Sequence, residues 1–161
     1  MQGDARVIEF LNDQLTAELT AINQYFLHAK LQENWGLTKL AKHTKAESID
    51  EMRHAEILTD RIIFLEGLPN YQKLFPLRIG ENVKEMFESD MMIEVEAVER
   101  LRAGIAHMTE VGDHTSKRLF ESILADEEHH VDYLETQLAL LDKLGEALYL
   151  QNVTEHPEAD D

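Results

Sequence analysis

Apolar residues recur at helical spacing along most of the chain, and no strand-like alternation of apolar and polar residues is sustained. This spacing predicts four long helices, near residues 5–34, 38–66, 82–111 and 115–144, and a short fifth helix over residues 146–151. Residues 1–151 are therefore expected to form a single all-α domain. The acidic residues 152–161 are predicted to form a disordered tail.

The lengths of the connections predict how the four helices are arranged. Trp35-Gly36 and Gly112-Asp113 are short turns, so the first two helices and the last two should each form an antiparallel hairpin. The middle connection could reach roughly 50 Å when extended, whereas a helix of about 28 residues is roughly 42 Å long. The connection can therefore return along the bundle and leave the second and third helices parallel. This is the ferritin-like four-helix bundle with one long crossover.

Composition excludes several classes of function. At 161 residues, the chain is long enough to bury the core of one domain, and it has no cysteine, which excludes disulfides, thiolate nucleophiles and cysteine-held metal sites. The net charge of −17 argues against nucleic acid as a partner and favours cations. A targeting signal and an apolar run of membrane-spanning length are both lacking, so no membrane association and a cytoplasmic location are expected.

Glutamate and histidine residues repeat at one offset along the chain. A Glu-x-x-His pair occurs twice, although roughly one such match is expected by chance in a chain this rich in both residues. A separate glutamate precedes each pair, and three pairs of residues lie 76 positions apart: Glu18 and Glu94, Glu51 and Glu127, and His54 and His130. Four carboxylates and two imidazoles related in this way predict a two-metal site built from two similar halves.

The same residues lie at one depth in the two predicted hairpins. Glu18 lies 18 residues before Gly36, and Glu51 and His54 lie 15 and 18 residues after it. The second hairpin repeats these separations about Gly112. Because residues three positions apart share one face of a helix, all six side chains can converge in the core of the bundle.

Four carboxylates buried together require bound cations, because they repel one another and lose hydration. Two divalent cations would neutralise the four carboxylates, with one imidazole completing the coordination of each. Oxygen and nitrogen ligands without a thiolate suit iron or manganese, and zinc could also bind. The pseudo-symmetry makes Glu51 and Glu127 the natural bridging ligands and Glu18 and Glu94 the terminal ones.

Other polar residues leave more than one interpretation open. Asp50 and Asp126 also obey the offset, and each is either an outer acceptor that fixes a histidine tautomer or a solvated residue. Tyr25, two turns beyond Glu18, either hydrogen-bonds a ligand carboxylate, donates an electron near the metals, or packs in the core. The remaining histidines lack counterparts at the offset and are interpreted as surface or packing residues: His28, His43, His107, His114, His129 and His156.

Several long segments resemble the bacterioferritin family over nearly the whole chain. They include Ala21-Ile22-Asn23-Gln24-Tyr25-Phe26-Leu27-His28-Ala29, Glu47-Ser48-Ile49-Asp50-Glu51-Met52, Phe64-Leu65-Glu66-Gly67-Leu68-Pro69-Asn70 and Asp126-Glu127-Glu128. The resemblance implies a ferritin-like bundle with a short C-terminal helix, and a hollow homo-oligomeric shell of 24 subunits. It also implies ferroxidase ligands at the paired positions: Glu18, Glu51, His54, Glu94, Glu127 and His130.

By this resemblance, the protein would store and detoxify iron. Iron(II) would be oxidised at a di-iron centre by oxygen or hydrogen peroxide and kept inside the shell as a ferric mineral, with a ferredoxin-type reductase as an implied partner. Ala46 departs from the pattern, because some bacterioferritins carry a histidine there that helps to bind an extra iron on the cavity wall. The chain therefore lacks that ligand, and the sequence leaves open both the additional site and any role of Asp50 in it.

The family also binds haem b at the two-fold interface between subunits, through one methionine from each. Met52 occupies that position by resemblance. Because it follows Glu51, its side chain points about 100° away from the metal site around the helix. Four residues that fall one or two turns apart on their own helices are expected to line the haem pocket: Ile22, Asn23, Phe26 and Ile49.

Other functions are compatible with the same ligands. A di-iron peroxidase or oxygenase of the rubrerythrin kind would use this geometry on bound substrates, although the chain has no cysteine for a rubredoxin-type electron donor. A haem-binding electron carrier would bind haem through Met52 and hold metal only structurally. A purely structural bundle would leave the shared offset unexplained. Ferroxidase activity with iron storage is the favoured interpretation.

Overall fold

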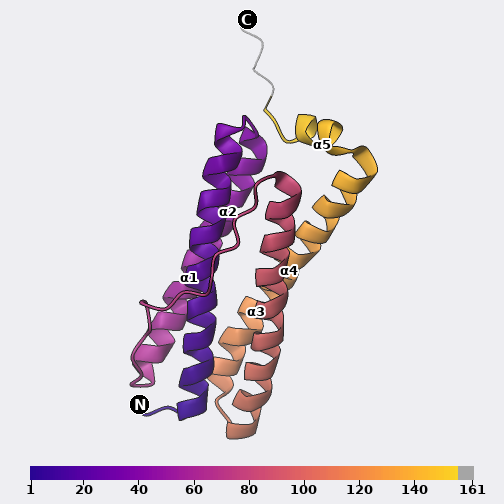
Figure 1. The fold of residues 1–161 in the computed structure, drawn as a ribbon. Helices are drawn as coiled ribbons and strands as arrows, with labels where there is room; N and C mark the ends of the chain where they lie inside the picture. Colours follow the sequence, from indigo (N-terminus) through magenta and orange to yellow (C-terminus); the bar gives the residue numbers. More distant parts are fainter. Residues whose placement is uncertain (156–161) are drawn as a thin grey trace, which may run out of the picture.

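The computed structural model describes residues 1–155 and is built from five helices. They are α1 (Ala5–Asn34), α2 (Thr38–Phe64), α3 (Val83–Val111), α4 (His114–Leu144) and α5 (Glu146–Asn152). Within residues 1–155 there is no strand, and none of these helices combines the length and apolar character needed to cross a bilayer. The predicted all-α bundle with a long crossover and a short fifth helix is confirmed (Figure 1).

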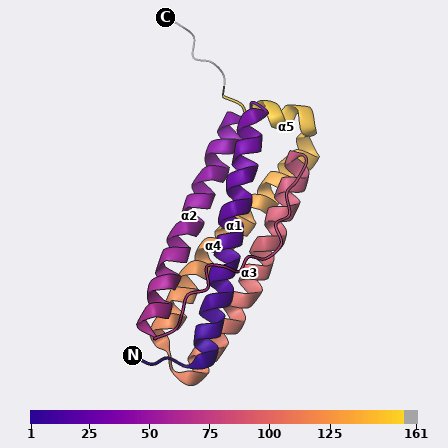
Figure 2. The same ribbon diagram turned by 60° about the vertical axis from the view of Figure 1, so that its left-hand side comes forward.

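Two antiparallel hairpins pack side by side in Figures 1 and 2. α1 pairs with α2, and α3 pairs with α4. The crossover, residues 65–82, returns along the bundle, so α3 starts at the end where α2 starts and the two helices run parallel. α5 lies at that same end, opposite the N-terminus.

Local backbone signals set the helix ends, which differ from the predicted ends by two residues or fewer. α2 ends at Phe64, two residues earlier than predicted, because Glu66 takes a left-handed φ of 63° that cannot continue the helix. α3 ends at Val111 and is followed by Gly112, whose φ of 77° suits a glycine C-cap. Its other end is capped by Asn82, whose side chain accepts a hydrogen bond from the backbone N–H of Glu85 (2.9 Å).

The bundle buries two apolar clusters with a polar layer between them. One cluster, toward the end where the N-terminus lies, includes Leu11, Leu58, Met108 and Phe120. The other, toward α5, includes Leu40, Phe87, Leu134 and Tyr149. The middle of the helices between these clusters carries the buried polar and charged residues, among them Glu18, Glu51, Glu94 and Glu127.

A row of polar side chains on α1 binds the crossover. Because the row repeats every four residues, its members share one face of the helix. They accept hydrogen bonds of 2.9, 2.9 and 3.0 Å from three backbone N–H groups of the crossover: Thr20 from Phe75, Gln24 from Arg78, and His28 from Gly80. The crossover can therefore lie against the bundle without leaving these N–H groups unsatisfied.

His28, like Gln24 in this row, has no exposed surface. Its Nε2 accepts the hydrogen bond from Gly80, so Nδ1 carries the proton and lies 3.0 Å from Asp90 Oδ1 on α3. A Cβ at Gly80 would come within 2.4 Å of the backbone nitrogen of Met86, so only glycine lets the crossover pass this close to the start of α3. Of the two open interpretations of His28, surface or packing, the structure selects packing.

Replacing His28 with leucine is expected to destabilise the protein by about 3 kcal/mol, because it leaves the Gly80 N–H without an acceptor and the buried Asp90 carboxylate with Gln24 as its remaining partner. Thermal unfolding followed by circular dichroism should show a lower midpoint than the wild type. The matched control is His114→Leu, which changes an exposed histidine and should unfold close to the wild-type midpoint. Equal midpoints for both variants would contradict a structural role for His28.

The chain beyond α5 folds back onto the start of α2. The carbonyl oxygen of Val153 accepts hydrogen bonds from the N–H groups of Lys39 and Leu40 (3.1 and 3.2 Å), and the N–H of Glu155 donates to Thr38 Oγ1 (3.2 Å). The prediction of a disordered tail is therefore wrong for residues 152–155. These contacts satisfy first-turn donors of α2, which has no side-chain N-cap. The rest of that predicted tail, residues 156–161 including His156, lies outside the described residues.

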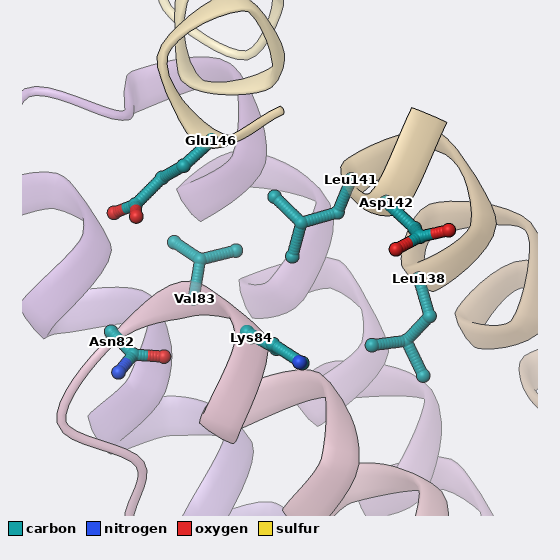
Figure 3. Close-up of a pocket in the computed structure, with 7 residues that line it drawn as sticks. All are labelled: Asn82, Val83, Lys84, Leu138, Leu141, Asp142 and Glu146. Carbon is teal, nitrogen blue, oxygen red and sulfur yellow. The ribbon is translucent and has the colours of Figure 1, made fainter. Parts of the chain in front are cut away.

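A groove of about 310 Å³ lies between the start of α3, the end of α4 and α5 (Figure 3). Val83, Leu138 and Leu141 form its apolar part, and polar side chains surround them: Asn82, Lys84, Asp142 and Glu146. Within residues 1–155, the clusters of side chains able to hold a metal lie in the polar layer and not in this groove. The candidate chemistry of the protein therefore lies in the middle of the bundle.

Candidate metal centre

Six residues of the polar layer form two overlapping clusters of potential ligands. Glu18, Glu51, His54 and Glu127 form one cluster, and Glu51, Glu94, Glu127 and His130 form the other; in each, the ligand atoms lie within 4.8 Å of one another. Each of the four long helices contributes at least one of them. Glu51 and Glu127 belong to both clusters, which is the arrangement expected of two carboxylates that bridge two cations.

Five side-chain atoms of these residues are buried and have no hydrogen-bond partner. All four glutamates are 1 % exposed or less. Each has one carboxylate oxygen without a hydrogen-bond partner, and the Nδ1 nitrogen of His54 also has no hydrogen-bond partner. Unpaired buried carboxylates are costly, so five convergent atoms of this kind fit a site for cations. Oxygen and nitrogen donors without sulfur fit iron, manganese or zinc.

The two histidines each turn Nδ1 toward the carboxylates. His54 Nδ1 lies 3.1 Å from Glu127 Oε1 and 3.5 Å from Glu18 Oε1. His130 Nδ1 lies 3.2 Å from Glu51 Oε1 and 3.3 Å from Glu94 Oε1. Both imidazoles can therefore offer a nitrogen to a cation held by the glutamates.

One of the two candidate outer acceptors reaches a histidine. Asp126 Oδ2 lies 2.8 Å from His54 Nε2, so a proton on Nε2 would leave the Nδ1 lone pair for a metal. Asp50, its counterpart at the offset, instead pairs with Arg53 (2.7 Å) on the exposed side of α2. The two halves of the site therefore differ outside the ligands.

The terminal carboxylates also have different outer donors. The Tyr25 hydroxyl donates to Glu94 Oε1, which favours the hydrogen-bonding interpretation of this tyrosine. Gln14 Nε2 donates to Glu18 Oε1 (2.8 Å). In both glutamates, Oε2 is the oxygen left without a partner. The repeat at an offset of 76 did not indicate Gln14 as a residue of the site. The sequence clue to its role is that it lies one turn before Glu18 on the same face of the helix.

Burial and mutual repulsion shift the protonation of the site. Burial, together with the charge of Glu18, raises the pKa of Glu51 well above its usual range, and burial with the charge of Glu94 does the same for the pKa of Glu127. Burial opposes protonation of His130, but its contact with Glu94 prevails and raises its pKa to about 9. Cations that bind here must displace these protons, so affinity should rise with pH.

Glu18 behaves differently from the two shared glutamates. Burial would raise its pKa, but hydrogen bonding with Glu51, His54 and Gln14 lowers the pKa of Glu18 below its usual value. Burial, followed by the charge of Glu94, raises the pKa of Tyr25 well above its usual range, so the hydroxyl keeps its proton. Tyr25 can therefore act as a donor to Glu94 across the physiological pH range.

A surface groove of about 370 Å³ between α2 and α4 leads to the two histidines. His54 and His130 line it together with Asp126, His129 and other residues of these helices. Access to the buried layer is therefore expected from the α2–α4 face, on the imidazole side of the ligands.

The residues predicted to contact haem lie outside the polar layer, on the outer side of α1 and α2. Met52 is 46 % exposed, and Ile22 and Met52 line one shallow groove with Leu19 and Tyr71. The other three predicted residues are exposed and are not part of that groove: Asn23, Phe26 and Ile49. This surface presents a thioether among apolar side chains, away from the six clustered residues.

Comparison with known proteins identifies relatives along the full chain. The ferritin-like domain family matches residues 8–144. A bacterioferritin of Streptomyces coelicolor is 67 % identical over 160 residues, covering 99 % of this chain and 96 % of that protein. Bacterioferritin BfrA of Mycobacterium tuberculosis is 60 % identical over 157 residues, covering 98 % of this chain and 99 % of that protein.

Solved structures agree with the fold. A mycobacterial bacterioferritin structure has a TM-score of 0.97 and 61 % identity, and covers 100 % of both chains. The structure of BfrA from Mycobacterium tuberculosis has a TM-score of 0.95 and 60 % identity, and covers 96 % of this chain and 98 % of that chain. The backbone of the chain therefore closely matches that of these bacterioferritin structures.

Proposed function

Since the chain belongs to the ferritin-like family and, within it, to the bacterioferritins, which store iron, we propose that it oxidises iron(II) at the buried layer of glutamates and histidines and stores the product as a ferric mineral. The observation that carries this proposal is the pair of overlapping ligand clusters with their unpartnered buried atoms. Two iron(II) ions would bind per chain, one with Glu18 and His54 and one with Glu94 and His130. Glu51 and Glu127 would lie between them.

The oxidation balances with two irons and one oxidant. Two iron(II) ions each lose one electron, and dioxygen with two protons becomes hydrogen peroxide, or hydrogen peroxide with two protons becomes two waters. The site residues hold the substrate ions together, since both electrons must reach one oxidant molecule. Tyr25 keeps Glu94 oriented through its hydroxyl, and it also lies close enough to the ligands to be an electron donor.

Storage requires an assembly, and the proposed one is a homo-oligomeric shell of 24 subunits that encloses the mineral. The exposed apolar residues on the outer side of α1 and α2 support such an assembly: Phe26, Ile49, Met52, Ile63 and Phe64 are all at least 40 % exposed. Apolar surface of this extent marks an interaction site.

We further propose that Met52 binds haem b at a two-fold interface with the same residue of a second subunit. Its exposed thioether, next to Ile22 in a shallow groove, fits an axial ligand to a haem that lies between two copies of this surface. Ile22, Asn23, Phe26 and Ile49 would pack around the ring. Bound haem would supply one-electron transfer, and a ferredoxin-type reductase is the proposed electron source for release of stored iron.

Aerobic loading of the apo-protein with iron(II), followed by size separation and measurement of iron in the protein peak, tests the proposal. We expect a large assembly that holds far more than two irons per chain, and loss of the fast oxidation phase in Glu18→Ala. A peak that saturates near two irons per chain would reject storage and favour a rubrerythrin-like peroxidase or oxygenase. Binding of haem without iron oxidation would favour an electron carrier.

A further inference from the structure

The two halves of the metal centre have different outer contacts, although one offset relates their ligands. On the Glu18 side, Arg100 Nη1 donates to Gln14 Oε1 (3.3 Å), and Gln14 Nε2 donates to Glu18 Oε1 (2.8 Å). The offset of 76 relates Arg100 to Gln24 and Gln14 to Asp90. This second pair is also hydrogen-bonded, from Gln24 Nε2 to Asp90 Oδ1 (2.8 Å). The outer pairs are thus equivalent in position but not in chemistry.

The two pairs differ in whether they can donate a hydrogen bond to the ligand carboxylate. Gln14 is an amide, so it accepts from Arg100 and donates to Glu18 at the same time. Asp90 accepts from Gln24 and has no N–H to offer Glu94, which takes its hydrogen bond from Tyr25 instead. Among the described residues, the Glu18 half is therefore linked to a fixed positive charge and the Glu94 half to a neutral hydroxyl.

Arg100 is itself held by the crossover and by neighbouring charges. Its guanidinium carbon lies 5.2 Å from the centroid of the Phe75 ring. Burial lowers the pKa of Arg100, and the charges of Asp13 and Glu96 act against that shift, so the side chain stays charged. A guanidinium has donors and no acceptor, so it fixes Gln14 with Oε1 toward Arg100 and Nε2 toward the ligand.

From these contacts we propose that Arg100, acting through Gln14, is a positioning residue that makes the Glu18–His54 metal position different from the Glu94–His130 position. This inference rests on the proposed function. Because Gln14 occupies Oε1 of Glu18, the unpartnered Oε2 is the oxygen left for the metal. Without Gln14, the Glu18 carboxylate can rotate, so its orientation toward the metal is no longer fixed. Metal affinity at the Glu18–His54 position therefore falls.

The test is an anaerobic titration of the apo-assembly with Co(II), a probe that is not oxidised under these conditions, followed by its visible absorption. His130→Ala serves as the background that keeps the Glu18–His54 position, and His54→Ala as the one that keeps the other position. In the first background, Gln14→Leu should weaken Co(II) binding roughly tenfold and Arg100→Met roughly threefold. In the second background, both changes should stay within about twofold of the parent.

Tyr25→Phe is the matched variant for the other half, because it removes the outer donor to Glu94 while keeping the ring. It should weaken Co(II) binding in the His54→Ala background and leave binding in the His130→Ala background within about twofold. Each variant is first checked for wild-type assembly mass and thermal midpoint. If Gln14→Leu does not assemble, Arg100→Met alone decides, because Arg100 lies outside the core.

Equal effects of Gln14→Leu or Arg100→Met in the two backgrounds, or no effect in either, would overturn the inference. The proposed function would still stand in that case, provided that the wild type binds two Co(II) per chain and stores iron. A wild type that binds fewer than two Co(II) per chain would instead reject the proposed function, and the inference with it.

Discussion

Replacing Glu127 with glutamine is expected to abolish tight metal binding at both positions and to slow iron(II) oxidation by roughly two orders of magnitude. Loss of a residue that only contacts a ligand already lowers metal affinity or activity by about 10–100-fold, so loss of a shared ligand should cost at least as much. Glu127 belongs to both clusters, with Oε1 3.1 Å from His54 Nδ1 and Oε2 3.8 Å from His130 Nδ1. Glutamine has the same shape, but it replaces a shared anionic oxygen with an N–H₂ group. Co(II) titration of the apo-protein and stopped-flow oxidation of iron(II) measure the two effects.

The same change should stabilise the apo-protein against heat, because Glu127 repels three other buried glutamates when ionised. Loss of metal binding together with a higher apo-protein midpoint separates a ligand role from simple misfolding. Glu128→Gln is the matched control, since the neighbouring Glu128 is exposed on the same helix and should change neither quantity. Retention of two Co(II) per chain in Glu127→Gln would show that this carboxylate does not bridge the positions.

Replacing Met52 with leucine is expected to reduce bound haem at least roughly tenfold, because leucine keeps the apolar surface but has no thioether to ligate the iron. The measurement is the Soret absorption per chain after reconstitution with haem b and removal of the excess. Because Met52 points away from the six clustered residues, iron loading provides a separate readout on the same sample.

Met92→Leu is the matched control for haem binding, since Met92 is a methionine of similar exposure on α3 (49 %, against 46 % for Met52). It should bind haem as the wild type does. An unchanged Soret band in Met52→Leu would assign the axial ligand to another residue and remove the two-fold haem site from the proposal. Loss of the band in both variants would indicate that the interface, and not a ligand, had changed.

The clustering of the six residues could be predicted from the sequence because helical spacing is local and periodic. Glu51 and His54 are one turn apart, and Glu18 lies as far before Gly36 as His54 lies after it. An antiparallel hairpin of regular helices therefore brings these side chains to one depth, and the offset of 76 repeats the arrangement in the second hairpin.

Contacts that depend on the path of the crossover or on helix packing could not be predicted in this way. Asp50 and Asp126 are equivalent by the offset, yet Asp126 reaches His54 and Asp50 pairs with Arg53. The burial of His28 depends on how closely Gly80 approaches α1. The defined conformation of residues 152–155 depends on free N–H groups at the start of α2, and no sequence pattern indicates that these groups bind the end of the chain.

The sequence by itself determined the helices, their order and the common depth of four glutamates and two histidines, because these follow from a rise of about 1.5 Å per residue and from turn positions. Tertiary structure alone decided which oxygen of Glu18 and Glu94 lacks a partner and which outer residue orients each carboxylate. Those choices depend on rotamers and on distances between helices, and neither leaves a periodic signal along the chain.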